Sequence, residues 1–240
     1  MPPHVVRESL RARHVHLRVS LRDGLEVVVP SGFDRTEIPA LLVEKARWIE
    51  RAQREVEFQR ALLDPWPPNE LPPRIDLRAV GETWRVDAAP AAGRGVVIEE
   101  RGDRHIAARG PVTDPAVWRP ALRRWLAARA SSELAPWVTR EASLHRLERG
   151  PVTVRWQKTR WGSCSRRAGA TEPHLSLNAG LLFLPPHLVR YVILHELCHA
   201  SRMDHSPEFW QRLESIEPAA QALRSELRNA WRFVPAWTAP

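Results

Sequence analysis

Apolar and polar residues alternate near the start of the chain. Val15, Leu17 and Val19 share one parity, with Arg or His between them, and the pair Asp23-Gly24 separates them from a second apolar run. Alternation is typical of a strand with one buried face, and Asp-Gly is a frequent hairpin turn. The pattern therefore predicts a β-hairpin over residues 10–30.

The spacing of the apolar residues changes to that of a helix after the hairpin. From Asp34 to about Leu63 these residues recur close to the helical period, which predicts one helix with an apolar face. Asp34 or Thr36 is suited to cap its start. Five prolines then occur between Asp64 and Pro73, which indicates a stiff connector and an internal boundary.

Short strands are expected beyond the connector, followed by one long helix. Glycines punctuate residues 74–109 as turns, and Asp114-Pro115 combines an acidic cap with a proline at the first helical position. This helix should reach about Leu147, with a kink or a split at Pro136. The remaining expected elements are strands at Val152–Trp156 and Leu175–Asn178, which bracket a Gly/Ser loop, and helices at Pro186–Arg202, from Pro207, and at about Pro218–Trp231.

These elements predict an α+β fold. Residues 1–73 would supply an N-terminal hairpin and helix region with its proline-rich connector. Residues 74–240 would supply the other strands, the long helix and the C-terminal helices. The pattern is equally compatible with both regions forming a single structural unit.

Composition indicates the class of protein. Of the 240 residues, 43% are hydrophobic and 27% are charged, a mixture typical of globular proteins in solution. The N-terminus has no apolar segment like that of a secretory signal, and no apolar run is long enough to span a bilayer. The two cysteines, Cys164 and Cys198, do not make a disulfide framework. We therefore expect a cytoplasmic protein with reduced cysteines and no membrane partner.

The formal net charge of +8 is compatible with an anionic partner. A basic surface attracts nucleic acid, nucleotides and acidic lipids. Most basic residues here are mixed with acids along the chain, which favours an ordinary solvated surface and leaves nucleic-acid binding only weakly indicated. The exception is residues 155–171, which contain five basic residues and no acidic one: Arg155, Lys158, Arg160, Arg166 and Arg167.

The clearest chemical motif is His195-Glu196-Leu197-Cys198-His199, of the form His-Glu-x-x-His. On a helix, residues four apart lie on one face, so both imidazoles can bind one metal ion. Glu196 lies one residue further round and can instead take a proton from a metal-activated water. The preceding residues 188–194 are apolar almost all round, which indicates a buried helix. Burying polar groups there is costly unless they have partners or a metal.

A third ligand is available in His205, six residues after His199. The helix would have to end near Met203, and Ser206-Pro207-Glu208 is suited to begin the next one. His205 would then be held between two helix ends. Three protein ligands and an open fourth position describe a catalytic zinc site, and we expect one zinc ion per chain.

Four segments together resemble a known family. They are Lys158–Ser165, Leu175–Asn178, His195–His199 and His205–Trp210. This combination is similar to the YgjP-like metallopeptidase family, which is related to the SprT-like zinc proteases. Residues 13–49 are also similar to the opening hairpin and helix of that family. The resemblance implies a zincin-like metallopeptidase domain with a small sheet, a buried metal-binding helix and the same three histidines as zinc ligands.

Three further residues are candidates for substrate binding. Arg160 lies in the basic stretch, and Tyr191, one turn before His195, is placed to donate to an oxyanion. Leu175–Asn178 precedes the metal helix, and an edge strand beside a zincin metal can bind an extended peptide by strand addition. We therefore name Arg160, Asn178 and Tyr191 as candidates. Ordinary core packing remains the alternative for Tyr191 and for the strand.

The function that these residues predict is that of a zinc-dependent metallopeptidase, a hydrolase in which Glu196 is the general base. Its partner would be a peptide or protein substrate. One alternative is a metal-dependent phosphohydrolase acting on nucleotides, of the nucleoside triphosphate pyrophosphatase type, in which the basic stretch clamps phosphates. The second alternative is a non-catalytic, DNA-associated binding module.

Overall fold

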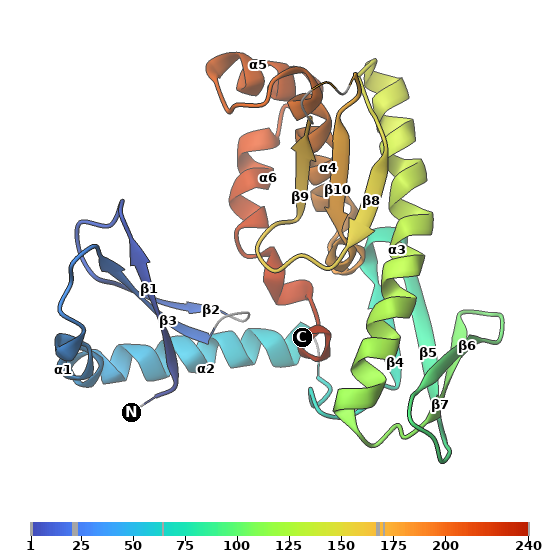
Figure 1. The fold of residues 1–240 in the computed structure, drawn as a ribbon, viewed down its shortest axis with the longest axis horizontal. Coiled ribbons are helices and arrows are strands. Elements are labelled where there is room, and N and C mark those ends of the chain that lie inside the picture. The colour runs from blue at the N-terminus through green and yellow to red at the C-terminus, as the bar shows by residue number, and fades with distance from the viewer. Residues whose placement is uncertain (1, 21–23, 64, 167–168, 170, 240) are drawn as a thin grey trace. The chain divides into compact units, whose positions relative to one another are not determined.

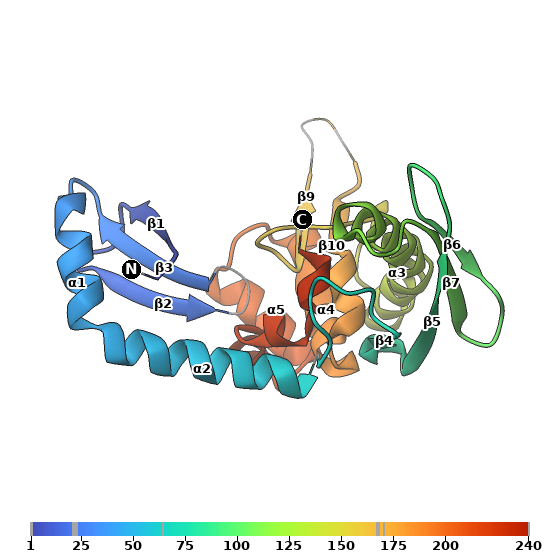
Figure 2. The ribbon, with the colours of Figure 1, turned by 90° about the horizontal axis from the view of Figure 1, so that it is seen from below.

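The computed structural model describes residues 2–20, 24–63, 65–166, 169 and 171–239. These residues form six α-helices and three small sheets, an α+β fold as the sequence predicts (Figures 1 and 2). The chain divides into two compact units. The first unit contains Met1–Trp66 and Trp231–Ala236, and the second contains Pro67–Ala230 and Trp237–Pro240. The division between Trp66 and Pro67 falls within the proline-rich segment of the sequence.

A three-stranded sheet forms one layer of the first unit (Figure 1). Its strands are β1 (His4–Ser9), β2 (His16–Ser20) and β3 (Gly24–Pro30), in the order β1-β3-β2. β3 pairs antiparallel with β2, which confirms the predicted strand pair, and parallel with β1. Asp23 of the expected turn lies outside the described residues. No pattern predicts β1, because Val5 and Val6 are its only apolar residues.

Two helices pack against this sheet (Figure 2). They are α1 (Ile38–Glu44) and α2 (Ala46–Leu63), preceded by a short 3-10 helix at Arg35–Glu37. Asp34 caps the first turn, as predicted, because its side chain accepts a hydrogen bond from the Thr36 backbone N–H at 2.9 Å. The expectation of one uninterrupted helix is wrong, since α1 ends before Lys45. Such a short break is invisible in the apolar pattern because Leu42 and Ile49 still reach the same core.

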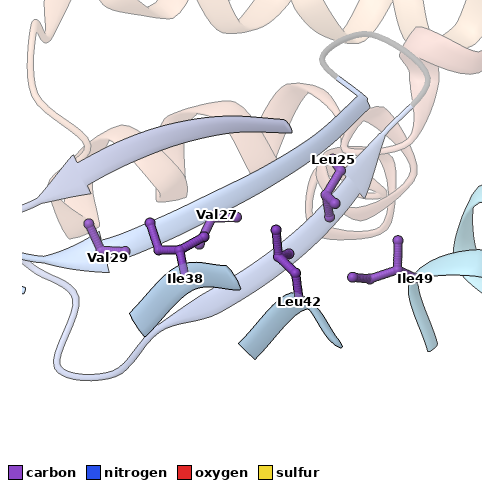
Figure 3. Packing of buried hydrophobic residues seen from close by; sticks show 6 residues of the cluster. All are labelled: Leu25, Val27, Val29, Ile38, Leu42 and Ile49. Carbon is purple, nitrogen blue, oxygen red and sulfur yellow. The ribbon is translucent and has the colours of Figure 1, made fainter. Parts of the chain in front are cut away.

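The core of the first unit lies between the sheet and the helices (Figure 3). It is made by six side chains that are each at most 4% exposed: Leu25, Val27, Val29, Ile38, Leu42 and Ile49. All six are aliphatic. The cohesion of this cluster therefore comes from the burial of apolar surface and from close packing.

The second unit begins with a four-stranded sheet. Its strands are β4 (Arg74–Leu77), β5 (Glu82–Pro90), β6 (Val97–Glu100) and β7 (His105–Gly110), in the order β4-β5-β7-β6. β5 and β7 are parallel, and the two outer strands pair antiparallel with their neighbours. These short strands confirm the prediction for residues 74–109.

The long helix α3 spans Pro115–His145. Asp114 caps it through the backbone N–H of Ala116 at 2.8 Å, and Pro115 takes the first helical position, as predicted. A kink or a split was expected at Pro136, and the helix is not split there. Leu134 and Val138, on either side of that proline, are fully buried, so packing holds the helix together where local propensity opposes it.

A second three-stranded sheet carries the segment before the metal-binding motif. Its strands are β8 (Val152–Arg155), β9 (Gly162–Ser165) and β10 (His174–Asn178), in the order β8-β10-β9. β8 and β10 confirm the two expected strands. The Gly/Ser loop expected between them instead contains β9, which pairs antiparallel with β10. Glycine and serine have little strand propensity, so only the pairing partner reveals this strand.

Three helices complete the second unit. They are α4 (Pro186–Ser201), α5 (Pro207–Ile216) and α6 (Ala220–Leu227). α4 packs against α3, α5, α6 and β9, and most of its side chains are buried, as its apolar sequence predicts. α6 is shorter at both ends than the helix expected there. Within the described ranges, every helix is too short or too polar to cross a membrane.

Candidate metal centre

The three predicted histidines meet at one point. His195 and His199 lie one turn apart on α4, and His205 lies in the short segment between α4 and α5. The Nε2 atom of His199 is 3.2 Å from that of His195 and 3.2 Å from that of His205. The Nε2 atoms of His195 and His205 are 3.1 Å apart. The ligand atoms thus form a nearly equilateral triangle.

This triangle fits a bound metal ion. An ion held tetrahedrally at about 2.0–2.1 Å from each nitrogen would keep those nitrogens about 3.3–3.4 Å apart. Three ring nitrogens in mutual contact cannot all be satisfied by hydrogen bonds among themselves, because a neutral imidazole carries only one N–H. A cation at the centre of the triangle resolves this conflict.

Burial keeps the histidines of α4 in the form that binds metals. Burial, helped by the neighbouring charges of His199, His205 and Arg224, lowers the pKa of His195 to about 3. Burial also lowers the pKa of His199. Both rings are therefore neutral near pH 7, with a lone pair available for a cation.

Neighbouring groups fix the orientation of two of the rings. The Nδ1 atom of His199 donates to the backbone carbonyl of Arg202 at 2.9 Å, which turns the Nε2 lone pair toward the triangle. The His199 ring also stacks on Phe209, with centroids 4.5 Å apart. The His205 ring stacks on Trp210, with centroids 5.9 Å apart. α5 begins at Pro207, as predicted, but the side chain of Ser206 makes no capping hydrogen bond.

Glu196 follows His195 on α4 and is only 6% exposed. Burial raises the pKa of its carboxyl to about 7, against the opposing effects of a hydrogen bond from the Cys164 backbone and the charge of Arg160. The strand β9 passes directly beside this carboxyl. A Cβ atom added at Gly162 would lie 2.8 Å from the Glu196 Oε1 atom and 2.7 Å from its Cγ, so only glycine fits there. A carboxyl with a pKa near 7 is suited to proton transfer.

His195, His205 and Glu196 line a cavity of about 500 Å³. Its wall includes side chains from four parts of the second unit: Arg160, Tyr191, His195, Glu196, His205 and Arg224. The cavity is large enough for a short peptide segment or a small ligand.

Two of the three candidate substrate residues line this cavity. Arg160 and Tyr191 are part of its wall. Burial raises the pKa of Tyr191 to about 12, so its hydroxyl keeps its proton and can donate a hydrogen bond at neutral pH.

Asn178 has a different position from the one expected. It is fully buried, and its amide nitrogen donates to the backbone carbonyls of Gln157 at 2.9 Å and Arg160 at 2.8 Å. Its amide oxygen accepts from the Gly180 backbone N–H at 3.0 Å. The side chain is thus fully used in holding the loop that carries Arg160.

Of the two alternatives for Leu175–Asn178, the structure shows the core strand and not the edge strand. β10 lies between β8 and β9 and has a partner on both sides, so β9 is the outer strand beside Glu196. The sequence left an edge position open for β10 because it did not predict β9. Without β9, β10 has only β8 as a neighbour.

The basic stretch does not act as one cluster. Arg155 donates to the Ser176 hydroxyl at 3.0 Å, and Arg166 pairs with Glu148 at 3.0 Å and donates to the Ala200 carbonyl. Arg167 lies outside the described residues. Of the described members, Arg160 is the one that lines the cavity. A second cavity arginine, Arg224 on α6, has no sequence signal, because a single exposed arginine on an amphipathic helix is unremarkable by pattern.

A buried helix with two histidines, a third histidine and a carboxyl beside them is an arrangement typical of metal-dependent hydrolases. The chain belongs to the YgjP-like family: the family model described as "YgjP-like, metallopeptidase domain" matches residues 13–230. This membership confirms the resemblance predicted from the sequence and supports a metal-dependent peptidase in general. The comparisons with curated proteins and with solved structures give no significant match.

Proposed function

We propose that this protein is a zinc-dependent metallopeptidase with one zinc ion per chain, held by His195, His199 and His205. The observation that carries the proposal is the convergence of three Nε2 atoms within 3.2 Å of one another beside the buried carboxyl of Glu196. Three neutral nitrogen ligands are the donor set that zinc takes in catalytic sites, where the fourth position stays open.

When bound, the zinc ion supplies a Lewis acid that polarises the scissile carbonyl and makes water more acidic. Glu196 accepts the proton of the attacking water and delivers it to the nitrogen of the leaving amine. Its raised pKa suits both roles, because the carboxyl can be deprotonated for the first and protonated for the second. Tyr191, which keeps its proton, donates a hydrogen bond to the oxygen that becomes negative.

The outer strand β9 is the part of the fold suited to orient a peptide. An extended substrate adds to the edge of a sheet through its backbone N–H and C=O groups. Gly162 brings this edge next to Glu196, where a side chain would collide with the carboxyl. Strand addition here would therefore place a peptide bond beside the proposed base.

A hydrolysis assay tests the proposal directly. The purified protein is loaded with zinc and incubated with casein and with a mixture of short model peptides, and the products are identified by mass spectrometry. We expect new peptide termini that disappear after treatment with a chelator and return when zinc is added. Intact peptides in the presence of a full equivalent of zinc would contradict the peptidase function.

A second candidate is a metal-dependent phosphohydrolase acting on nucleotides. The observation in its favour is that Arg160 lines the cavity of the metal centre and can contact a phosphate. Against a phosphate clamp, Arg155 and Arg166 are engaged elsewhere. Release of pyrophosphate from nucleoside triphosphates in a peptide-free assay, without cleavage of any peptide, would favour this candidate over the peptidase.

A further inference from the structure

Two arginines from different elements reach the cavity beside the metal centre. Arg160 lies in the loop before β9, and Arg224 lies on α6. The guanidinium of Arg224 stands over the ring of Trp210, with its central carbon 4.6 Å from the ring centroid. Trp210 in turn stacks on His205. This chain of contacts holds the Arg224 charge close to the proposed zinc ligands.

Both arginines are available to a ligand. Each is exposed, and among the described residues neither forms an ion pair or a side-chain hydrogen bond. Some other arginines of the second unit are engaged: Arg166 pairs with Glu148, Arg129 with Glu82, and Arg190 with Glu141. Arg160 and Arg224 differ from these in that they line one cavity together.

The cavity wall offers little negative charge to balance them. Among its described residues the only acidic side chain is Glu196. Its carboxyl is almost fully buried and is the proposed general base. The wall therefore presents two free guanidinium groups beside the metal centre. Such a wall attracts an anionic group of the substrate.

We propose that Arg160 and Arg224 form a subsite for a carboxylate that the peptide substrate carries next to its scissile bond. The planar guanidinium matches a carboxylate in a paired arrangement of hydrogen bonds. The subsite names a substrate class for the proposed peptidase and so rests on that function. It makes Arg224 a specificity-determining residue that acts by contact with the substrate.

A carboxylate explains the wall better than a polyphosphate does. Sites for nucleotide phosphates usually add backbone N–H groups from a glycine-rich loop or from a helix N-terminus. Here α4 and α6 line the cavity through Tyr191, His195, Arg224 and Leu227, which lie away from the N-termini of these helices.

The carboxylate has two possible sources in a peptide. One is the free C-terminus of the substrate, which would make the enzyme act near chain ends. The other is an aspartate or glutamate side chain, which would permit cleavage within a chain. Four peptides of one alanine-rich sequence separate them: a free C-terminus, its amide, and the amide with one glutamate or one glutamine at a central position.

The test measures binding of these four peptides to the zinc-loaded Glu196→Gln variant by isothermal titration calorimetry. We expect one carboxylate peptide to bind about tenfold more tightly than its neutral counterpart, the size of one charge-assisted contact. Arg224→Gln in the same background should remove most of that ratio. Arg228→Gln, which removes a charge one turn further along the chain, is the matched control and should preserve it.

The outcomes separate the subsite from the function. A carboxylate preference that depends on Arg224 supports the subsite even if the wild-type protein cleaves none of the peptides, a result that would count against the peptidase alone. Equal binding of charged and neutral peptides overturns the subsite, as does an equal loss in Arg228→Gln. Binding of a nucleoside triphosphate that requires Arg224, without any carboxylate preference, also overturns it. Arg224→Glu adds a second check, because it should favour a lysine peptide over the glutamate peptide.

Discussion

The two three-stranded sheets of this protein have the same topology. In β1-β3-β2 and in β8-β10-β9, the first strand is parallel to the third and the second is antiparallel to it. In both, the third strand leads into a 3-10 helix whose start is capped by an Asp or Asn side chain. Asp34 accepts from the Thr36 backbone N–H, and Asn178 accepts from the Gly180 backbone N–H.

The interiors built on these two frames differ in their content of buried polar side chains. The six residues of the first core are aliphatic. Every buried polar side chain among the described residues belongs to the second unit: Glu141, Ser176, Asn178, Glu196, His199 and Thr238. The same sheet topology and the same capped 3-10 helix thus occur in two settings. The core of the first unit is held by apolar packing, whereas the second unit must also provide hydrogen-bond partners for buried polar groups.

The difference teaches where chemistry can be placed. Burying a polar group costs free energy unless the group is paired or binds a ligand. A unit that contains such groups therefore needs other residues that hydrogen-bond to them or position them. Asn178 is one such residue, because it holds the backbone of the Arg160 loop. The Arg202 carbonyl is another supporting group, because it orients His199. The described residues of the first unit include no buried polar side chain that would need such support.

The parts of the fold that could be predicted are those that depend on residues close together in the sequence. The β2–β3 pair, the capped start of α3 and the convergence of the histidines all depend on residues close together in the chain. His205 is ten positions from His195, and helix-ending and helix-starting residues confine the segment between them. Periodicity and capping are short-range signals, so they serve well here.

The parts that were missed depend on distant partners. β9 is a strand because β10 lies beside it, and its glycine matters because Glu196 packs against it. Arg224 belongs to the cavity because α6 packs on α4. The apolar pattern of one segment does not contain these relations, since each joins two separate elements of the fold.

The largest expected effect is the loss of zinc binding by the second unit when one of the three histidines is removed. His195→Ala, His199→Ala and His205→Ala should each weaken zinc binding by more than about 100-fold, because each removes one of three protein ligands. Elemental analysis after dialysis and a peptide assay measure the loss. His187→Ala, an exposed histidine paired with Glu226, is the control and should retain zinc.

One result would correct the ligand set. If His205→Ala kept full zinc and full activity, the third ligand would have to be sought among the acidic residues nearby, at Asp204, Glu208 and Glu214. The two α4 histidines would then still define the site.

Glu196→Gln should have the next largest effect. The change keeps the shape of the side chain and leaves both flanking histidines in place, so zinc content should be unchanged. Turnover should fall by about 10² to 10⁴, the usual contribution of a general base. Zinc and turnover are measured on one preparation. A zinc-loaded variant that turns over substrate as fast as the parent would exclude Glu196 as the base.

A substitution in the core of the first unit should lower stability and leave zinc binding unchanged. Leu42→Ala removes a side chain that is 2% exposed and should lower the free energy of unfolding of the first unit by about 2–5 kcal/mol. Zinc affinity should not change, because the ligands lie in the second unit. Hydrogen exchange of β3 amides measures the stability. Val43→Ala, at an adjacent position that is 76% exposed, is the control and should change it by less than about 0.5 kcal/mol. Loss of zinc in Leu42→Ala would show that the two units are coupled.

The last expected effect is a pH dependence that arises from the buried carboxyl of the second unit. Burial raises the pKa of Glu196 to about 7 in the folded protein, above the value of 4.5 for an exposed carboxyl. A raised pKa of this kind contributes stability below about pH 4.5 that is lost as the pH rises through 7, because the folded state resists ionisation. Relative to Glu196→Gln, which does not titrate, the metal-free protein should therefore become less stable between these pH values, by on the order of 3 kcal/mol.

The same comparison cancels the contributions of the buried histidines His195 and His199. Their lowered pKa values work in the opposite direction: the contribution of His195, for example, is present above pH 6.5 and is lost as the pH falls toward 3. These contributions are common to the parent and to Glu196→Gln, so they cancel in their difference. Urea unfolding of both proteins in the presence of a chelator, from pH 4.5 to 8, gives the difference directly. The destabilisation by Leu42→Ala should be constant over this range, because its surroundings are aliphatic. A difference between parent and Glu196→Gln that is equally flat would mean that the carboxyl is solvated in the metal-free protein, and that the second interior is less dry than its burial indicates.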